Sequence, residues 1–190
     1  MKLIAILFGA IFVNNFVLTR FLGICPFIGV SRRSKPALSM GIAVMFVMLI
    51  ATIITWPLTY FVLNPYNVEY LQTVVFILVI AAAVQLIEQW MQKKHPELHK
   101  TLGIYLPLIT TNCAILGVAL LNITKSYNFI ESIVHSIGAG IGFILALFLM
   151  SGIRERLQIS NIPEAFQGVP IAFIVAGFMA LAFMGLAGIV

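Results

Sequence analysis

The chain has 190 residues, of which 62% are hydrophobic and only 9% are charged, with a net charge of +5. A soluble domain averages about 25% charged residues, so this composition excludes a water-soluble monomer, and the high apolar content excludes a disordered chain. Two cysteines also exclude a small secreted scaffold held together by disulfides. The composition therefore predicts an integral membrane protein.

Six apolar segments follow one another along the chain, and a transmembrane helix needs about 20 such residues. In order, they cover approximately residues 3–30, 40–63, 71–91, 102–121, 129–150 and 169–190. Long apolar runs of this kind argue against a β-barrel, whose strands alternate in polarity. No small-x-small cleavage site follows the first apolar stretch, so we expect a retained span and not a cleaved signal peptide. The sequence predicts one all-α membrane domain, residues 1–190, with six transmembrane helices.

The first and fourth segments are interrupted by polar residues and prolines. The interruptions are Asn14, Asn15 and the Cys25-Pro26 step in the first segment, and Pro107 and residues 110–112 (Thr-Thr-Asn) in the fourth. Such breaks are tolerated in a membrane where the freed backbone groups face protein or a cavity. We therefore expect two broken helices, each of which carries one cysteine.

The basic residues are distributed unevenly over the predicted loops. Eight of the eleven lysines and arginines fall in loops one, three and five, namely Arg32, Arg33, Lys35, Lys93, Lys94, Lys100, Arg154 and Arg156. The positive-inside rule places these loops in the cytoplasm and both termini on the periplasmic or extracellular side. The net positive charge is thereby explained by membrane topology, and it does not indicate nucleic-acid binding.

The two cysteines stand in matching sequence contexts. Residues 25–30 (Cys-Pro-Phe-Ile-Gly-Val) and residues 113–118 (Cys-Ala-Ile-Leu-Gly-Val) share the cysteine, an aliphatic residue, the glycine and the valine. The next clear span begins 16 residues after each cysteine, near Gly41 and near Phe129. Each half then holds three spans, an odd number, so the second half enters the membrane from the opposite face. The pattern predicts an inverted repeat of residues 1–95 and 96–190, with Cys25 and Cys113 approaching each other at its axis.

Three interpretations of the cysteine pair follow from the residues alone. Membrane cysteines are often small inert apolar residues. Two thiolates also suit a soft metal such as iron or zinc, but such a site needs two further ligands, which would have to come from a partner protein. A disulfide between Cys25 and Cys113 is the third interpretation. The equivalent positions of both cysteines beside helix breaks make the inert interpretation less favoured, and they leave the metal and the disulfide open.

Histidines and carboxylates give weaker signals. His95 and His99 stand four residues apart, but Pro96 and the surrounding charges favour a cytoplasmic loop. Glu131 and His135 stand one helical turn apart, so they share a helix face and lie within reach of a hydrogen bond.

The motifs around both cysteines resemble the A-type membrane subunits of the Rnf family of electron-transport complexes. The resemblance covers essentially the whole chain and is carried by residues 14–18, 21–31, 102–114, 117–122, 152–156 and 176–185. A closely similar group is the E-type subunit of the sodium-pumping NADH:quinone reductase. Asn14-Asn15, Cys25-Pro26 and the Thr-Thr-Asn-Cys run ending at Cys113 are more like the Rnf version.

The resemblance implies a subunit of an ion-translocating ferredoxin:NAD oxidoreductase in the bacterial or archaeal cytoplasmic (inner) membrane, coupled to Na⁺ or H⁺ transport. It implies a homologous partner of opposite membrane orientation, the E-type Rnf subunit. Cys25 and Cys113 match the family's iron ligands, with two further cysteines from that partner, around a shared 2Fe–2S cluster or, alternatively, a mononuclear iron. Flavins, further clusters and the NAD site belong to other subunits, so we expect neither flavin nor NAD on this chain and no complete active site.

A redox-free transporter is the competing class, because inverted repeats with discontinuous helices are common in transporters. In that case Asn14, Asn15, Thr110 and Asn112 bind an ion or solute and the cysteines are idle. A purely structural anchor for soluble redox proteins is a further alternative. Both predict a colourless protein without iron.

Overall fold

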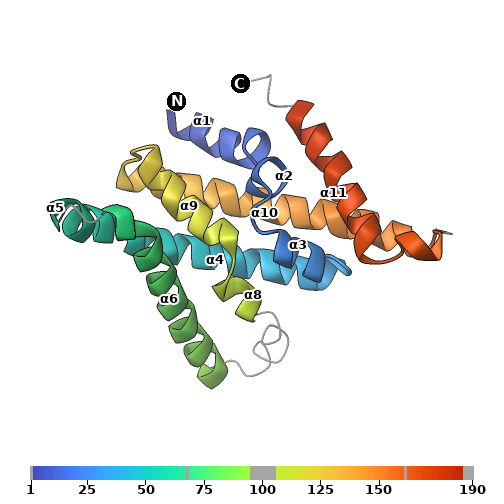
Figure 1. Ribbon diagram of the computed structural model, residues 1–190, viewed down its shortest axis with the longest axis horizontal. Coiled ribbons are helices and arrows are strands. Elements are labelled where there is room, and N and C mark those ends of the chain that lie inside the picture. Colours follow the sequence, from blue (N-terminus) through green and yellow to red (C-terminus); the bar gives the residue numbers. More distant parts are fainter. Residues whose placement is uncertain (1, 67–68, 95–105, 161, 186–190) are drawn as a thin grey trace.

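The structure is a computed structural model that describes residues 2–66, 69–94, 106–160 and 162–185. The described part of the chain is helical and contains no strand (Figure 1). The prediction of an all-α protein is confirmed. His95 and His99 lie outside the described residues.

The N-terminal segment is a helix in several pieces. They are α1 (Lys2–Phe8), the π-helical turn η1 (Gly9–Val13), α2 (Phe16–Arg20) and α3 (Ile24–Val30). Asn15 begins α2, because its side-chain oxygen accepts hydrogen bonds from the backbone N–H groups of Val17 and Leu18. Phe21 and Gly23 then have positive φ values in the left-handed region, so a right-handed helix cannot continue through them. The predicted break at Asn14–Asn15 is confirmed. The break predicted at the Cys25-Pro26 step is wrong, because both residues lie inside α3 and the chain breaks at Phe21–Gly23 instead.

The second broken segment consists of α8 (Leu106–Thr110) and α9 (Cys113–Thr124). Asn112 begins α9 as its N-cap, since its Oδ1 accepts a hydrogen bond from the N–H of Ala114 over 3.0 Å. The break falls in the predicted Thr-Thr-Asn run.

Long helices make up the rest of the molecule. They are α4 (Ser34–Leu58), continued by η2 (Thr59–Leu63) and α5 (Asn64–Tyr66), then η3 (Glu69–Leu71), α6 (Gln72–Lys94), α10 (Phe129–Leu157), η4 (Glu164–Phe166) and α11 (Val169–Met184). Both α4 and α10 extend beyond the apolar runs at their charged ends. Among the described residues, four stretches are long and apolar enough to cross a membrane: Ser34–Leu63, Gln72–Gln89, Pro107–Thr124 and Phe129–Leu157. Lys2–Val13 and Val169–Met184 are shorter apolar helices.

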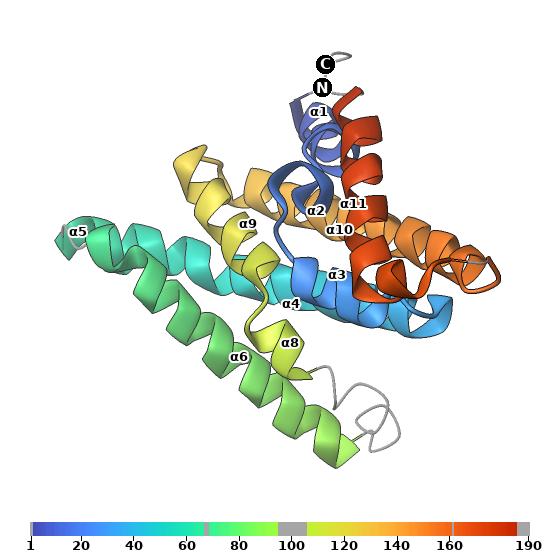
Figure 2. The ribbon, with the colours of Figure 1, turned by 45° about the vertical axis from the view of Figure 1, so that its right-hand side comes forward.

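Helices α4 and α10 form the central pair and run side by side through the molecule (Figures 1 and 2). Glycines let the two backbones approach, because a Cβ on Gly140 would lie 3.2 Å from Cα of Met45 and one on Gly41 would lie 3.4 Å from Cα of Ile144. Their facing side chains, such as Met40 and Leu147, are fully buried. The core of the protein lies between these two helices.

The other helices pack around this pair so that helices from residues 1–95 contact helices from residues 96–190. Helix α4 contacts α9, whereas α10 contacts α1, η1 and α2. Helix α6 contacts α8 and α9, whereas α11 contacts α2 and α3. Each half of the chain thus packs its long helices against the broken helix of the other half, and this brings the two cysteine-bearing segments to the centre of the molecule.

Candidate functional site

Cys25 lies in the first turn of α3, directly after the break at Phe21–Gly23. Gly23 is the N-cap and has a φ of 81°. A Cβ at this position would lie 2.8 Å from Cε2 of Phe143 and 3.2 Å from Cβ of Ala114, so only glycine fits. The Cys25 side chain itself is exposed and carries a free thiol.

Cys113 is the first residue of α9 and follows the cap residue Asn112. It is likewise exposed and free. Both cysteines therefore stand at helix N-termini, where unpaired backbone N–H groups and the helix dipole favour negative charge. The disulfide considered from the sequence is not formed in this structure.

A hydrogen bond joins the two cysteine-bearing breaks. The backbone N–H of Gly23 donates to Sγ of Cys113 over 3.0 Å. Behind it, a Cβ on Gly117 would lie 2.6 Å from Cδ1 of Leu22, so the start of α9 packs tightly against the turn before α3. In Figure 2 the connection between α2 and α3 passes beside α9. The structure thus places the two motifs, 90 residues apart in sequence, in direct contact.

Asn112 carries an unsatisfied donor at this junction. Its Nδ2 is buried and has no hydrogen-bond partner among the described residues, although Oδ1 caps α9. A buried unpaired amide N–H costs about 1–3 kcal/mol, so an acceptor beside it would be favourable. Within the described ranges, no group of three or more His, Cys, Asp and Glu side chains is arranged to hold a metal. The two thiols are thus an incomplete ligand set in this part of the chain.

The asparagines proposed as solute ligands have different roles. Asn15 is completely buried, and its Nδ2 donates to the carbonyl oxygens of Gly142 over 2.8 Å and Ile11 over 3.3 Å. With Oδ1 capping α2, this side chain is engaged on both sides. Asn14 is exposed and lines a cavity of about 270 Å³ with Lys2 and Lys125.

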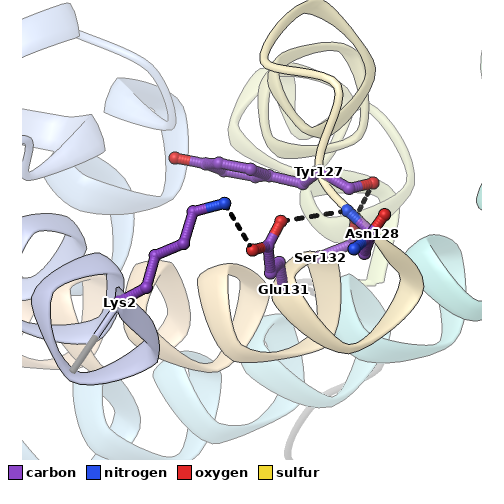
Figure 3. Close-up of polar contacts among 5 residues, drawn as sticks. All are labelled: Lys2, Tyr127, Asn128, Glu131 and Ser132. Atoms are coloured by element: carbon purple, nitrogen blue, oxygen red, sulfur yellow. Dashed lines mark hydrogen bonds and ion pairs between the residues drawn. The ribbon is translucent and has the colours of Figure 1, made fainter.

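Glu131 and His135 share a face of α10, but each side chain has another partner. Glu131 instead forms an ion pair with Lys2 over 2.8 Å and accepts from the backbone N–H of Asn128 over 3.1 Å, as Figure 3 shows. The reason is its place three residues after the N-cap Asn128, where a glutamate folds back to complete a capping box.

His135 belongs to a buried polar chain that the sequence did not predict. Its Nδ1 donates to Oδ1 of Asn122 over 2.7 Å, and Nδ2 of Asn122 donates to Oγ of Ser136 over 3.4 Å. The hydroxyls of Ser136 and Thr52 lie 2.7 Å apart. This chain joins α9, α10 and α4. Its only sequence signal was the presence of polar residues in apolar helices.

Arg154 was also missed, because the sequence placed it in a cytoplasmic loop. Helix α10 continues to Leu157, and Arg154 is 6% exposed. Its Nη1 donates to the carbonyl oxygen of Ile28 over 2.6 Å and to Oγ of Ser31 over 2.9 Å. This arginine therefore fixes the C-terminal end of α3, the helix that carries Cys25.

The fold and the site together define a class: an all-helical integral membrane protein whose two broken helices present exposed cysteines at one junction. The description "Rnf-Nqr subunit, membrane protein" belongs to the family model that matches residues 3–190. The chain belongs to this family, and the resemblance seen in the sequence is confirmed.

Relatives with assigned functions match the chain over nearly its whole length. The A-type subunit of an ion-translocating oxidoreductase complex from Syntrophotalea carbinolica is 57% identical over 189 residues, which are 100% of this chain and 98% of the relative. The A-type subunit of a Na⁺-translocating ferredoxin:NAD⁺ oxidoreductase complex from Acetobacterium woodii is 57% identical over 188 residues, 99% of this chain and 98% of the relative. The A-type subunit of an ion-translocating oxidoreductase complex from Vibrio cholerae is 51% identical over 185 residues, which are 97% of this chain and 96% of the relative.

Proposed function

We propose that this chain is the A-type subunit of an Rnf-type ion-translocating ferredoxin:NAD oxidoreductase in a prokaryotic cytoplasmic membrane. The names of the relatives from Syntrophotalea carbinolica and Acetobacterium woodii, at 57% identity over the full length, support this assignment. They favour it over an E-type subunit of the sodium-pumping NADH:quinone reductase. The complex couples electron transfer to the movement of Na⁺ or H⁺, and this chain is one of its membrane subunits.

Within the complex, this chain holds half of an iron–sulfur centre through Cys25 and Cys113. The observation that carries this proposal is the hydrogen bond from Gly23 to Cys113, which holds the two cysteine-bearing breaks together. Two exposed thiols with no further ligand among the described residues call for two more from outside. A homologous subunit of opposite orientation supplies them, and a 2Fe–2S cluster fits four thiolates, as does a single iron.

The residues of the chain suit an anionic centre. Such a centre, when bound, supplies one-electron transfer in the interior of the membrane. The N-termini of α3 and α9 present positive helix ends to it, and the Gly23 N–H withdraws charge from the Cys113 sulfur. The buried Nδ2 of Asn112 is a further donor at this junction, and it has no partner in the part of the chain that the structure describes. These groups offset part of the cost of negative charge in a low dielectric.

The length of α9 supports a position inside the membrane. Its 12 residues rise about 18 Å from Cys113 to Thr124, which is followed by Lys125. A hydrocarbon core is about 30 Å thick. With Lys125 at one interface, the cysteine lies well inside the core, where an electron carrier divides a long transfer into shorter ones.

Six spans in two inverted halves are part of the proposal. The packing of the two halves against each other supports it, since α4 and α10 pair at the centre while α6 and α11 each cover the broken helix of the other half. A two-fold axis in the membrane plane produces this pattern. The basic loops then face the cytoplasm and both termini face the opposite side.

The redox-free transporter is the weaker alternative. It requires Asn15 as a ligand, and this side chain is fully engaged in capping α2 and binding Gly142. It also gives no reason for two exposed thiols at helix N-termini.

The test replaces each cysteine in the complete complex. In Cys25→Ser and Cys113→Ser complexes we expect one iron–sulfur signal to vanish from the electron paramagnetic resonance difference spectrum, and ferredoxin:NAD activity to fall to background. The iron content falls by two atoms per complex for a 2Fe–2S cluster and by one for a mononuclear site. The matched control is Thr111→Ser, which keeps the exposed hydroxyl that donates to the carbonyl oxygen of Pro107.

Either serine variant with unchanged iron content and an unchanged spectrum shows that the ligand assignment is wrong. Loss of activity with all iron retained points instead to a structural role of the cysteines. Assembly of each complex is checked by its protein composition, so that loss of the signal is not confused with loss of the chain itself.

A further inference from the structure

A cavity of about 360 Å³ opens where α10 ends and α11 begins. It is bounded by residues from the α3–α4 turn, the last turns of α10 and the α10–α11 connection. The residues that matter for its chemistry are Arg32, Arg154, Ser160, Gln167 and Gly168. Two arginines line it, and no acidic side chain is among its described lining residues.

Arg154 gives this cavity an unbalanced charge. The residue is almost completely buried, and only its Nη1 is used to bind Ile28 and Ser31. In the part of the chain that the structure describes, no carboxylate lies within ion-pair distance of this guanidinium. A buried arginine without a counter-charge is costly, so the cavity favours an anion.

The N-terminus of α11 adds to the positive potential. This 16-residue helix begins at Val169 after Gly168, and no side chain caps it. Gly168 and Ile171 both line the cavity, so the first turn of the helix faces it. Pro170 in this turn has no N–H, so the donors that can bind phosphate oxygens are the backbone N–H groups of Val169 and Ile171.

The walls of the cavity are tied together by hydrogen bonds. Nε2 of Gln158 donates to the carbonyl oxygen of Arg32 over 3.4 Å, and Nε2 of Gln167 donates to that of Ile162 over 2.9 Å. The cavity therefore exists before any ligand binds, which reduces the entropy cost of binding.

An apolar groove continues from the cavity along α10. It has a volume of about 460 Å³ and is lined by Phe148, Leu149, Gly152, Ile153 and Arg156, and it shares Leu157 and Ser160 with the cavity. A Cβ on Gly152 would meet nothing within 4 Å, so the groove is open there. A charged cavity joined to an apolar groove has the shape of a phospholipid, with the phosphate in one and an acyl chain in the other.

We infer that this site binds an anionic phospholipid, whose phosphate is held by Arg154, Arg32 and the N-terminus of α11 and whose acyl chain lies along the Phe148–Ile153 face of α10. On the orientation proposed above, the site lies at the cytoplasmic surface, where basic pockets between transmembrane helices bind anionic headgroups. Because Arg154 also fixes the end of α3, the lipid phosphate supplies the counter-charge for a residue that positions the Cys25 helix.

The test measures lipids on the intact purified complex by native mass spectrometry and thermal unfolding. The probes are phosphatidylglycerol, phosphatidylcholine and inorganic phosphate. We expect phosphatidylglycerol to stay bound and to raise Tm, with no effect from the other two. Arg32→Gln lowers phosphatidylglycerol affinity about fivefold, the effect of one basic residue at an anionic surface. The matched control is Arg33→Gln, an adjacent exposed arginine that does not line the cavity.

A second pair of variants tests the acyl groove without removing charge. Gly152→Leu fills the groove and displaces the lipid. Gly185→Leu adds the same bulk at another exposed glycine that meets nothing within 4 Å, at the C-cap of α11, and leaves retention unchanged. Equal binding of phosphatidylcholine overturns the proposal, and so does unchanged retention in Arg32→Gln. Stabilisation by inorganic phosphate to the same extent shows a free-anion site and overturns the lipid assignment. The result is independent of iron, so it fails or succeeds separately from the proposed function.

Discussion

The backbone N–H of Gly23 donates a hydrogen bond to Sγ of Cys113, with a nitrogen–sulfur distance of 3.0 Å. The two residues are 90 positions apart and belong to different broken helices. An N–H group that donates to a ligating sulfur raises the reduction potential of the cluster that this sulfur holds. Position 23 requires glycine because of its positive φ and because no space is left for a Cβ. Substitution of Gly23 by alanine, which adds one methyl group, therefore tests the hydrogen bond.

Gly23→Ala is expected to destabilise the protein by about 1 to 3 kcal/mol. The new Cβ would lie 2.8 Å from Cε2 of Phe143, at a φ of 81° that disfavours a side chain. To relieve this contact the turn must move, and the Gly23 N–H then leaves the Cys113 sulfur. We expect a lower Tm of the purified complex and, under the proposed function, a lower reduction potential of its intramembrane cluster in a redox titration.

Gly29→Ala in the same helix is the matched control for Gly23→Ala. A Cβ on Gly29 would meet only Cδ1 of Leu108, at 3.9 Å, and α3 is regular there. This variant should leave Tm unchanged or raise it slightly through better helix propensity. Equal effects of the two substitutions would show that the turn at Gly23 has no special role.

Asn15→Ala should destabilise the protein by about 2 to 4 kcal/mol, because it removes a helix cap and two buried donor contacts at once. The carbonyl oxygen of Gly142 and the N–H of Val17 lose their partners. The preceding Asn14 is exposed, so Asn14→Ala should change stability by less than about 0.5 kcal/mol. Thermal unfolding of the two variants side by side makes the comparison. Similar losses in both would show that Asn15 is not the residue that breaks the first helix.

The broken helices and the cysteine contact were predictable from local rules. Long apolar runs specify helices in a membrane, and Asn15 and Asn112 stop them because asparagine caps the following helix. The repeated cysteine motif predicted that the two breaks meet, and the contact between Gly23 and Cys113 agrees with it. The prediction that two distant segments meet rested on the likeness of the two motifs, which is itself a feature of the sequence.

Contacts between unrelated positions were not predictable in the same way. Glu131 pairs with Lys2, the second residue of the sequence, and no periodicity relates the two. Arg154 lies in a charged stretch that resembles a loop, yet it turns inward because the end of α3 offers it the carbonyl oxygen of Ile28. Such pairings depend on how helices pack, and the local sequence carries little information about that.

The buried pair of His135 and Asn122 gives a prediction that separates hydrogen bonding from packing. Asn122→Leu leaves the His135 Nδ1 without an acceptor and should cost about 1 to 3 kcal/mol. The double variant with His135→Phe removes both polar groups and keeps an aromatic ring against Phe16 and Tyr127. We expect the double variant to lose less stability than the two single variants lose together, by about 1 kcal/mol or more. A double-mutant cycle of thermal stability measures this difference. Additive losses would show that the two side chains do not interact.

Gly140→Ala probes the central helix pair at a point where the backbones of α4 and α10 approach closely. A Cβ on Gly140 would lie 2.8 Å from Cβ and 3.2 Å from Cα of Met45, atoms that cannot move without the α4 backbone. Overpacking of this kind costs about 1 to 3 kcal/mol, so Tm should fall. Gly152→Ala, on the same helix, meets nothing within 4 Å and should raise stability by up to about 1 kcal/mol, since alanine is the better helix former. We therefore expect Tm to fall for Gly140→Ala and to rise for Gly152→Ala, because α10 packs against α4 through Gly140 and leaves Gly152 open. A rise in Tm for both variants would mean that the backbones of α4 and α10 lie further apart than the structure places them.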